Sequence, residues 1–179
     1  MKTKTIMALA GLSIALSGCV MNNTVPINYA PSSVLSASGS VTVTDFSYLP
    51  AQTGKVQPNQ VRNTALGSIL FDQNVSTIFR DAVFKELRFV GVNMNSVNRK
   101  LSGEIQEFLI DDLGFSVTWT LRVKYQVTDK GGVVYEQVKA TQRTTGKFGN
   151  PFGAINETIK LNIEELIKDK DFLAVLNGG

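Results

Sequence analysis

The sequence predicts a two-layer α+β sandwich, in which a mainly antiparallel sheet carries helices on one face in the order β-α-β-β-β-α. Residues 115–127 alternate strictly between apolar and polar side chains, which is the pattern of a strand with one buried face. The turn sequence from Asp129 to Gly132 joins this strand to a second one. Two further segments have apolar residues at three- and four-residue spacings, which predicts two amphipathic helices.

The domain is expected to begin with a strand and a long irregular connection. Val41 and Val43 alternate with threonines, which predicts the strand. Residues 47–63 contain two prolines and one glycine and predict a connection without regular structure, which leaves room for a short strand near residues 66–71.

A helix follows from about residue 75 to residue 90. Asn74 or Asp72 can cap its start, and Gly91 can close its end. Its apolar stripe consists of Val75, Ile78, Phe79, Ala82, Val83, Leu87 and Val90. The stripe predicts a helix that packs on the sheet.

Three strands and a second helix complete the domain. Residues 100–111 form the first of these strands, in which Gly103 interrupts the apolar pattern, and residues 115–128 form the second. The third strand, residues 133–144, is expected to turn Val134, Val138 and Ala140 toward the core. A loop over residues 145–153 then leads to a helix and a short last turn. The helix has the apolar stripe Ile155, Ile159, Ile163, Leu166 and Ile167, and the last turn adds Phe172, Leu173 and Leu176.

The first eighteen residues have the composition of a secretory signal. Lys2 and Lys4 precede an apolar run from Ile6 to Leu16, and small residues follow. The run is too short to cross a bilayer as a stable helix. The alternative that we keep open is an ordinary signal peptide that happens to contain a cysteine near its end.

The sequence Leu16 to Cys19 also resembles the bacterial lipobox, in which small residues separate a leucine from an invariant cysteine. The resemblance implies cleavage before Cys19 and acylation of its sulfur and new amino group. Two or three acyl chains anchor a protein almost permanently. We therefore expect a signal peptide over residues 1–18, a lipidated cysteine and flexible tether over residues 19–39, and a single domain over residues 40–179. Because no Asp follows Cys19, the sorting rule favours the outer membrane, with the domain facing the periplasm.

Composition restricts the class of partner. The chain has 18 Lys and Arg against 15 Asp and Glu, and two of the lysines belong to the signal segment. The mature part is therefore nearly neutral, and we expect no nucleic-acid partner.

The residues for catalysis are missing from the sequence. The chain has no histidine and one cysteine, which removes Ser-His, Cys-His and histidine-metal sites. No phosphate-binding glycine motif occurs. Asp111 and Asp112 are adjacent at a strand end, so they point to opposite faces, and we interpret them as a solvated turn. We expect no enzyme, no metal and no cofactor.

Two features are candidates for binding. Phe115, Trp119 and Tyr125 lie on one face of the alternating strand, either as core or as the wall of a cavity that accepts a lipid chain. Phe148 and Phe152 lie in a glycine-containing loop, where they either dock on a partner or membrane or pack under the final helix.

The order of these elements resembles the YajG-like group of small Gram-negative lipoproteins. The resemblance rests on the signal and tether, on Leu101, Gly103 and Ile105 at the start of a strand, on the D-x-G-G turn, and on the closing helix. More distantly, the chain is similar to auxiliary lipoproteins of ABC-type lipid transport. The first resemblance implies a non-catalytic binding or assembly accessory with a protein partner in the cell envelope. The second implies a lipid-binding module as the alternative.

Overall fold

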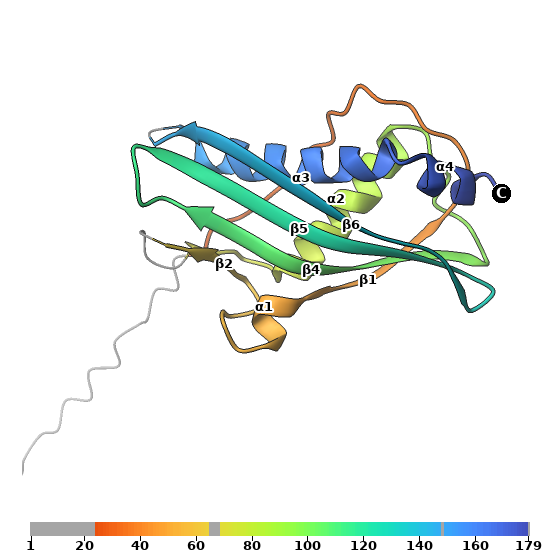
Figure 1. Ribbon diagram of the computed structural model, residues 1–179, viewed down its shortest axis with the longest axis horizontal. Helices are drawn as coiled ribbons and strands as arrows, with labels where there is room; N and C mark the ends of the chain where they lie inside the picture. Colours follow the sequence, from red (N-terminus) through yellow and green to blue (C-terminus); the bar gives the residue numbers. More distant parts are fainter. Residues whose placement is uncertain (1–23, 65–68, 148, 179) are drawn as a thin grey trace, which may run out of the picture.

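In the computed structural model, a six-stranded sheet carries helices on one face (Figure 1). The structure describes residues 24–64, 69–147 and 149–178. The strands are β1 (Thr42–Tyr48), β2 (Gln60–Asn63), β3 (Ile69–Leu70), β4 (Arg99–Asp111), β5 (Ser116–Asp129) and β6 (Gly132–Gly146). The helices are α1 (Leu49–Gln52), α2 (Val75–Phe89), α3 (Pro151–Ile167) and α4 (Lys170–Leu176). The predicted α+β class with a mainly antiparallel sheet is confirmed.

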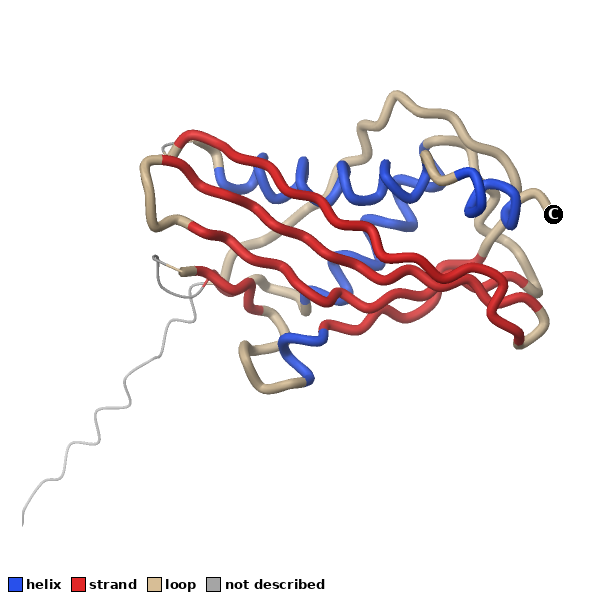
Figure 2. The backbone as a smooth tube through the Cα atoms, viewed as in Figure 1, coloured by secondary structure: helices blue, strands red, loops and turns tan. Residues whose placement is uncertain are grey.

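Strand β4 organises the sheet. The spatial order is β3-β2-β4-β5-β6, and β4, β5 and β6 form an antiparallel meander. On its other edge β4 pairs in parallel with β1 along its first half and with β2 along its second half. Strand β6 therefore lies at one edge of the sheet, as Figure 2 shows.

Both predicted helices are confirmed with their apolar stripes buried. All seven predicted stripe residues of α2 are buried, and so are the five of α3. Gly91 ends α2 with a φ of +107°, which suits glycine because a left-handed conformation is costly for other residues. The side chain of Asn74 makes no capping hydrogen bond, although Asn74 is the N-cap residue.

The centre of the core is an aromatic cluster that depends on a glycine. The rings of Phe46, Phe79 and Tyr125 lie with their centroids 5.6–6.3 Å apart. A Cβ on Gly103 would lie 2.3 Å from Cε1 of Phe46. The glycine that interrupts the apolar pattern of β4 thus leaves the space that the Phe46 ring fills.

The predicted face of β6 is wrong. Val134, Val138 and Ala140 are exposed, whereas Tyr135 and Thr141 are buried. The turn itself is as predicted, with Asp129 opposite Gly132, but a register shift follows at Val127, which pairs with Tyr135. One extra residue in a strand moves every later side chain to the other face.

Three further expectations differ from the structure. Residues 47–63, expected without regular structure, contain α1 and β2. Phe115 precedes β5, has no partner strand, and is fully exposed, so it does not belong to the core. Residues 24–39, expected as part of a tether, pack along the domain, with Ile27 and Tyr29 buried. Glu86 on α2 holds this segment, because its carboxylate accepts hydrogen bonds from the Tyr29 hydroxyl and from the backbone N–H of Ser33 at 2.7 Å.

Candidate functional site

Two loops and the start of a helix meet at one end of the sheet, where β4 and β6 end and β5 begins. They are the β4–β5 loop (residues 112–115), the described residues of the β6–α3 loop (147, 149 and 150) and the first turn of α3. We call this the loop end. The opposite end contains the β5–β6 turn and the residues before β4, and we call it the hairpin end.

A small cavity at the loop end borders Trp119. Its volume is about 180 Å³, and its lining includes Ile69, Ile110, Asp112, Val117, Trp119 and Pro151. Trp119 itself is 3% exposed, and its indole N–H donates to Oγ1 of Thr145 at 2.8 Å. The sequence therefore identified a residue that lies between the core and the loops.

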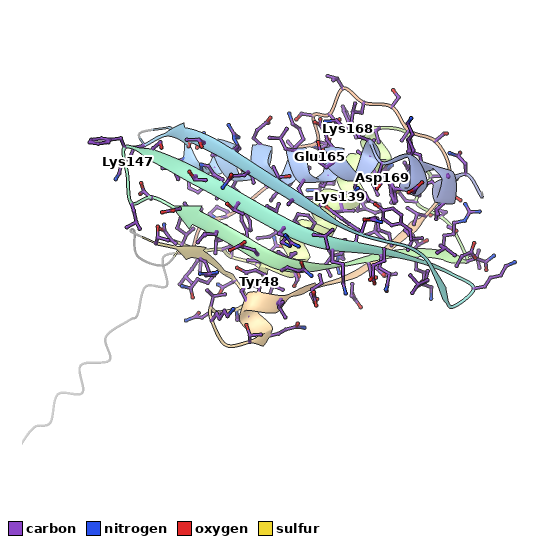
Figure 3. The ribbon with its side chains drawn as sticks, viewed as in Figure 1. Tyr48, Lys139, Lys147, Glu165, Lys168 and Asp169 are labelled. Carbon is purple, nitrogen blue, oxygen red and sulfur yellow. The ribbon has the colours of Figure 1, made fainter. Side chains whose placement is uncertain are left out.

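Asp112 lies in the wall of the same cavity. We expected a solvated turn at Asp111 and Asp112, but Asp112 is buried, and its Oδ1 lies 3.4 Å from Nζ of Lys147. Asp111 points elsewhere and accepts a hydrogen bond from Thr64 at 2.9 Å. Lys147 also donates to the backbone oxygen of Gly114 at 3.1 Å and so connects the two loops (Figure 3).

Large apolar side chains are exposed at the loop end. Leu113 is 73% exposed, Phe115 is fully exposed, and Phe152 is 42% exposed on the first turn of α3. Asn150 caps that helix, since its side chain accepts hydrogen bonds from the N–H groups of Phe152 and Gly153. Two other predicted site residues, Cys19 and Phe148, lie outside the described residues.

The outer surface of β6 is the second candidate. Val133, Val134 and Val138 are exposed along a strand whose free edge pairs with no other described strand. We call these three valines and that edge the outer edge of β6. Edge strands of this length are normally covered or protected by charges, because their free backbone groups can pair with another chain.

The inner surface of β6 is polar and binds the helices. The Tyr135 hydroxyl donates to Asp169 at 2.8 Å, and the Lys139 amine contacts the same carboxylate (Figure 3). Burial alone would raise the pKa of Asp169, but the hydrogen bonds from Lys139 and Tyr135 hold it below its ordinary value. Burial and the hydrogen bond to Asp169 raise the pKa of Tyr135.

Asn162 connects α3 to the sheet. It is fully buried and accepts a hydrogen bond from the Tyr125 hydroxyl at 2.9 Å. Its amide nitrogen donates to the backbone oxygen of Lys139 at 3.1 Å and to Oγ1 of Thr141 at 3.2 Å. Sequence reasoning missed this residue, although an asparagine three positions after Ile159 in an apolar stripe was a visible signal.

Comparisons with known proteins support the fold alone. No protein-family model matches the sequence, and no curated protein sequence matches it. Protein XCC0632 from Xanthomonas campestris, of family DUF330, is similar in structure with a TM-score of 0.60 at 14% identity, over 86% of this chain and 92% of that one. The hypothetical protein CT253 from Chlamydia trachomatis has a TM-score of 0.55 at 10% identity, over 79% of this chain and all of that one.

A lipoprotein is among the weaker structural matches. Lipoprotein GNA1162 from Neisseria meningitidis matches with a TM-score of 0.31 at 10% identity, over 71% of this chain and 99% of that one. Within the part of the chain that the structure describes, no helix is both long and apolar enough to cross a membrane.

Proposed function

We propose that the chain is a non-catalytic lipoprotein of the bacterial cell envelope that docks a protein partner on the outer edge of β6. Acyl chains on Cys19 hold it at the outer membrane, and the domain faces the periplasm. The observation that carries the docking proposal is the exposure of Val133, Val134 and Val138 beside an unpaired strand edge.

Val134 and Val138 support binding because their side chains lie outside the core. The bulge after the turn places Tyr135 and Thr141 inside and leaves Val134 and Val138 in water. A partner that adds a strand to this edge gains backbone hydrogen bonds, and alternate side chains of that strand would cover the valines. The partner that fits is a protein with an extended segment that is apolar at alternate positions.

The lipid-carrying alternative has less support. An acyl chain needs an apolar cavity, and the cavity that borders Trp119 measures about 180 Å³. Small-molecule sites normally enclose roughly 300–1,000 Å³. A buried aspartate and a lysine also border this cavity, which suits an apolar chain poorly.

A matched pair of variants tests the docking proposal. The double variant Val134→Thr/Val138→Thr keeps the β-branched shape and removes apolar surface, whereas Val97→Thr makes the same change at an 88% exposed valine outside the strands. Tagged wild-type protein should bring down a partner from detergent-extracted envelopes, and the double variant should lose it while Val97→Thr keeps it. Equal recovery with all three proteins would contradict docking at this edge.

A further inference from the structure

We propose that the loop end of the domain rests on the lipid bilayer, with Leu113 and Phe115 inserted among the lipid headgroups. The inference rests on the proposed anchor at Cys19 and adds the surface through which the folded domain meets the membrane. It concerns the β4–β5 loop and Lys147, whereas docking of a protein concerns the outer edge of β6.

The direction of the chain at Val25 places the anchor on the side of the loop end. Val25 forms a parallel bridge with Phe71, and its N–H donates to the backbone oxygen of Leu70 at 2.8 Å. Strand β4 runs toward the loop end, β2 is parallel to β4, and β3 is antiparallel to β2. The chain at Val25 therefore runs away from the loop end, and it enters the sheet from that side (Figure 1).

The length of chain before Val25 limits how far the domain can stand from the membrane. Val25 pairs with Phe71, whose N–H donates to the backbone oxygen of Asn59. Asn59 is three residues before Arg62, and Arg62 pairs with Leu109 on β4. Val25 therefore lies level with a point about five residues, or about 17 Å, before the end of β4. Cys19 is six residues before Val25 and can lie at most about 20 Å from it. An acylated Cys19 can therefore reach only a few ångströms beyond the end of β4.

This reach is shorter than the thickness of the headgroup layer. The headgroup regions together add about 10–15 Å to the hydrocarbon core, or roughly 5–7 Å on each side. A domain held upright by Cys19 must therefore bring the β4–β5 loop into contact with that layer.

The side chains at the loop end suit such contact. Leu113 is 73% exposed and Phe115 is fully exposed, and neither has a role in the core. Apolar and aromatic side chains with nearby basic groups are the residues that bind at membrane interfaces. Lys147 lies against this loop with 40% of its side chain exposed, and its amine balances the charge of the buried Asp112.

An exposed valine at the other end of the sheet provides the comparison. Val97 is 88% exposed but precedes Arg99, where β4 begins, so it lies at the hairpin end. The thirteen residues of β4 separate the two ends by about 40 Å. This distance makes Val97 a matched control for Leu113 and Phe115.

Environment-sensitive labels on the full-length lipidated protein test the inference. Leu113→Cys, Phe115→Cys and Val97→Cys each place one free thiol on an exposed site, because acylation consumes the sulfur of Cys19. The probe is a nitrobenzoxadiazole label, and the membranes are vesicles of phosphatidylethanolamine and phosphatidylglycerol. We expect blue-shifted emission and loss of iodide quenching at positions 113 and 115, with neither effect at position 97.

The outcomes separate this inference from the anchor on which it rests. Protein that floats with the vesicles while the labels at 113 and 115 remain quenched by iodide would overturn the inference and leave the anchor intact. Protein that carries no acyl mass by mass spectrometry and does not float would overturn both. Blue-shifted emission at position 97 but not at 113 and 115 would show that the domain lies the other way up.

Discussion

Strands β5 and β6 are neighbours in one hairpin, yet they use their apolar residues in opposite ways. In β5 the apolar residues from Val117 to Val127 all point into the core. In β6 the valines point to solvent, and the inner surface consists mainly of polar side chains that bind α3 and α4. Apolar alternation therefore locates a strand, but the face that it buries also depends on the register.

The bulge after the β5–β6 turn explains this contrast. Without it, Val127 would oppose Val134, and Val134 and Val138 would point inward. With it, Val127 opposes Tyr135, whose ring packs on Phe172 with centroids 5.5 Å apart. The polar contacts of Tyr135, Lys139 and Thr141 thus favour the register that leaves the valines outside.

The largest effect is expected from truncation of the buried face of β5. Trp119→Ala removes a large side chain that is 3% exposed, and such truncations cost about 3–5 kcal/mol in the free energy of unfolding. Urea denaturation measures this loss. A variant with wild-type stability and impaired binding would instead place Trp119 in a recognition surface.

Deletions in β6 test the role of the bulge. Deleting Val134 should remove the bulge, keep Tyr135 opposite Val127 and leave stability nearly unchanged. Deleting Val138 should either turn residues 139–145 over or turn Tyr135 outward, at a cost of about 2–3 kcal/mol. Thermal unfolding of both variants measures the difference, and equal destabilisation would show that the bulge does not set the register.

Removal of the Asn162 side chain, which links α3 to β5 and β6, should lower the free energy of unfolding by somewhat less. Asn162→Ala leaves the buried hydroxyl of Tyr125 without its acceptor, which costs about 1–3 kcal/mol. The control is Asn156→Ala, six residues earlier on α3, because the half-buried Asn156 side chain donates only a long hydrogen bond, to the backbone oxygen of Asn28 at 3.5 Å, among the described residues. Chemical denaturation that gives equal stability for both variants would contradict the assignment of Asn162 as the link.

The contact between Asp169 and β6 predicts a smaller effect that depends on pH. Because folding lowers the pKa of Asp169, this carboxylate adds stability above its ordinary pKa of about 4 and loses that contribution as the pH falls through the folded value. Asp169→Asn should therefore be less stable than wild type near neutral pH, and the difference should shrink in acid. A difference that stayed constant with pH would assign the effect to packing.

The sequence predicted the elements with long apolar patterns. It failed where a single residue determines the register of a strand or the point at which the strand begins. The stripes of α2 and α3 and the buried face of β5 follow directly from spacing. The face of β6 depends on one bulged residue, and the exposure of Phe115 depends on β5 beginning at Ser116. No pattern in the local sequence indicates the bulge or the start of β5, because strand pairing determines both.

The candidate sites were predictable to a similar degree. Trp119 and Phe152 were identified from sequence and lie at the loop end, one buried and one exposed. Asp112 was expected in solvent but is buried, and Nζ of Lys147, which follows β6, lies 3.4 Å from its carboxylate. The outer edge of β6 could not be found, because the apolar pattern predicts Val134 and Val138 in the core.

Photo-crosslinking in living cells tests the central claim, docking on the outer edge of β6, most directly. A photoreactive amino acid at Val138 should give a discrete crosslink to an envelope protein, whereas the same residue at Thr120, on the outer face of β5, should give much less. Crosslinks of equal strength from both positions, or from neither, would contradict docking at this edge. A crosslink from Val138 only to a second copy of the chain would also contradict it, because the edge would then serve self-association.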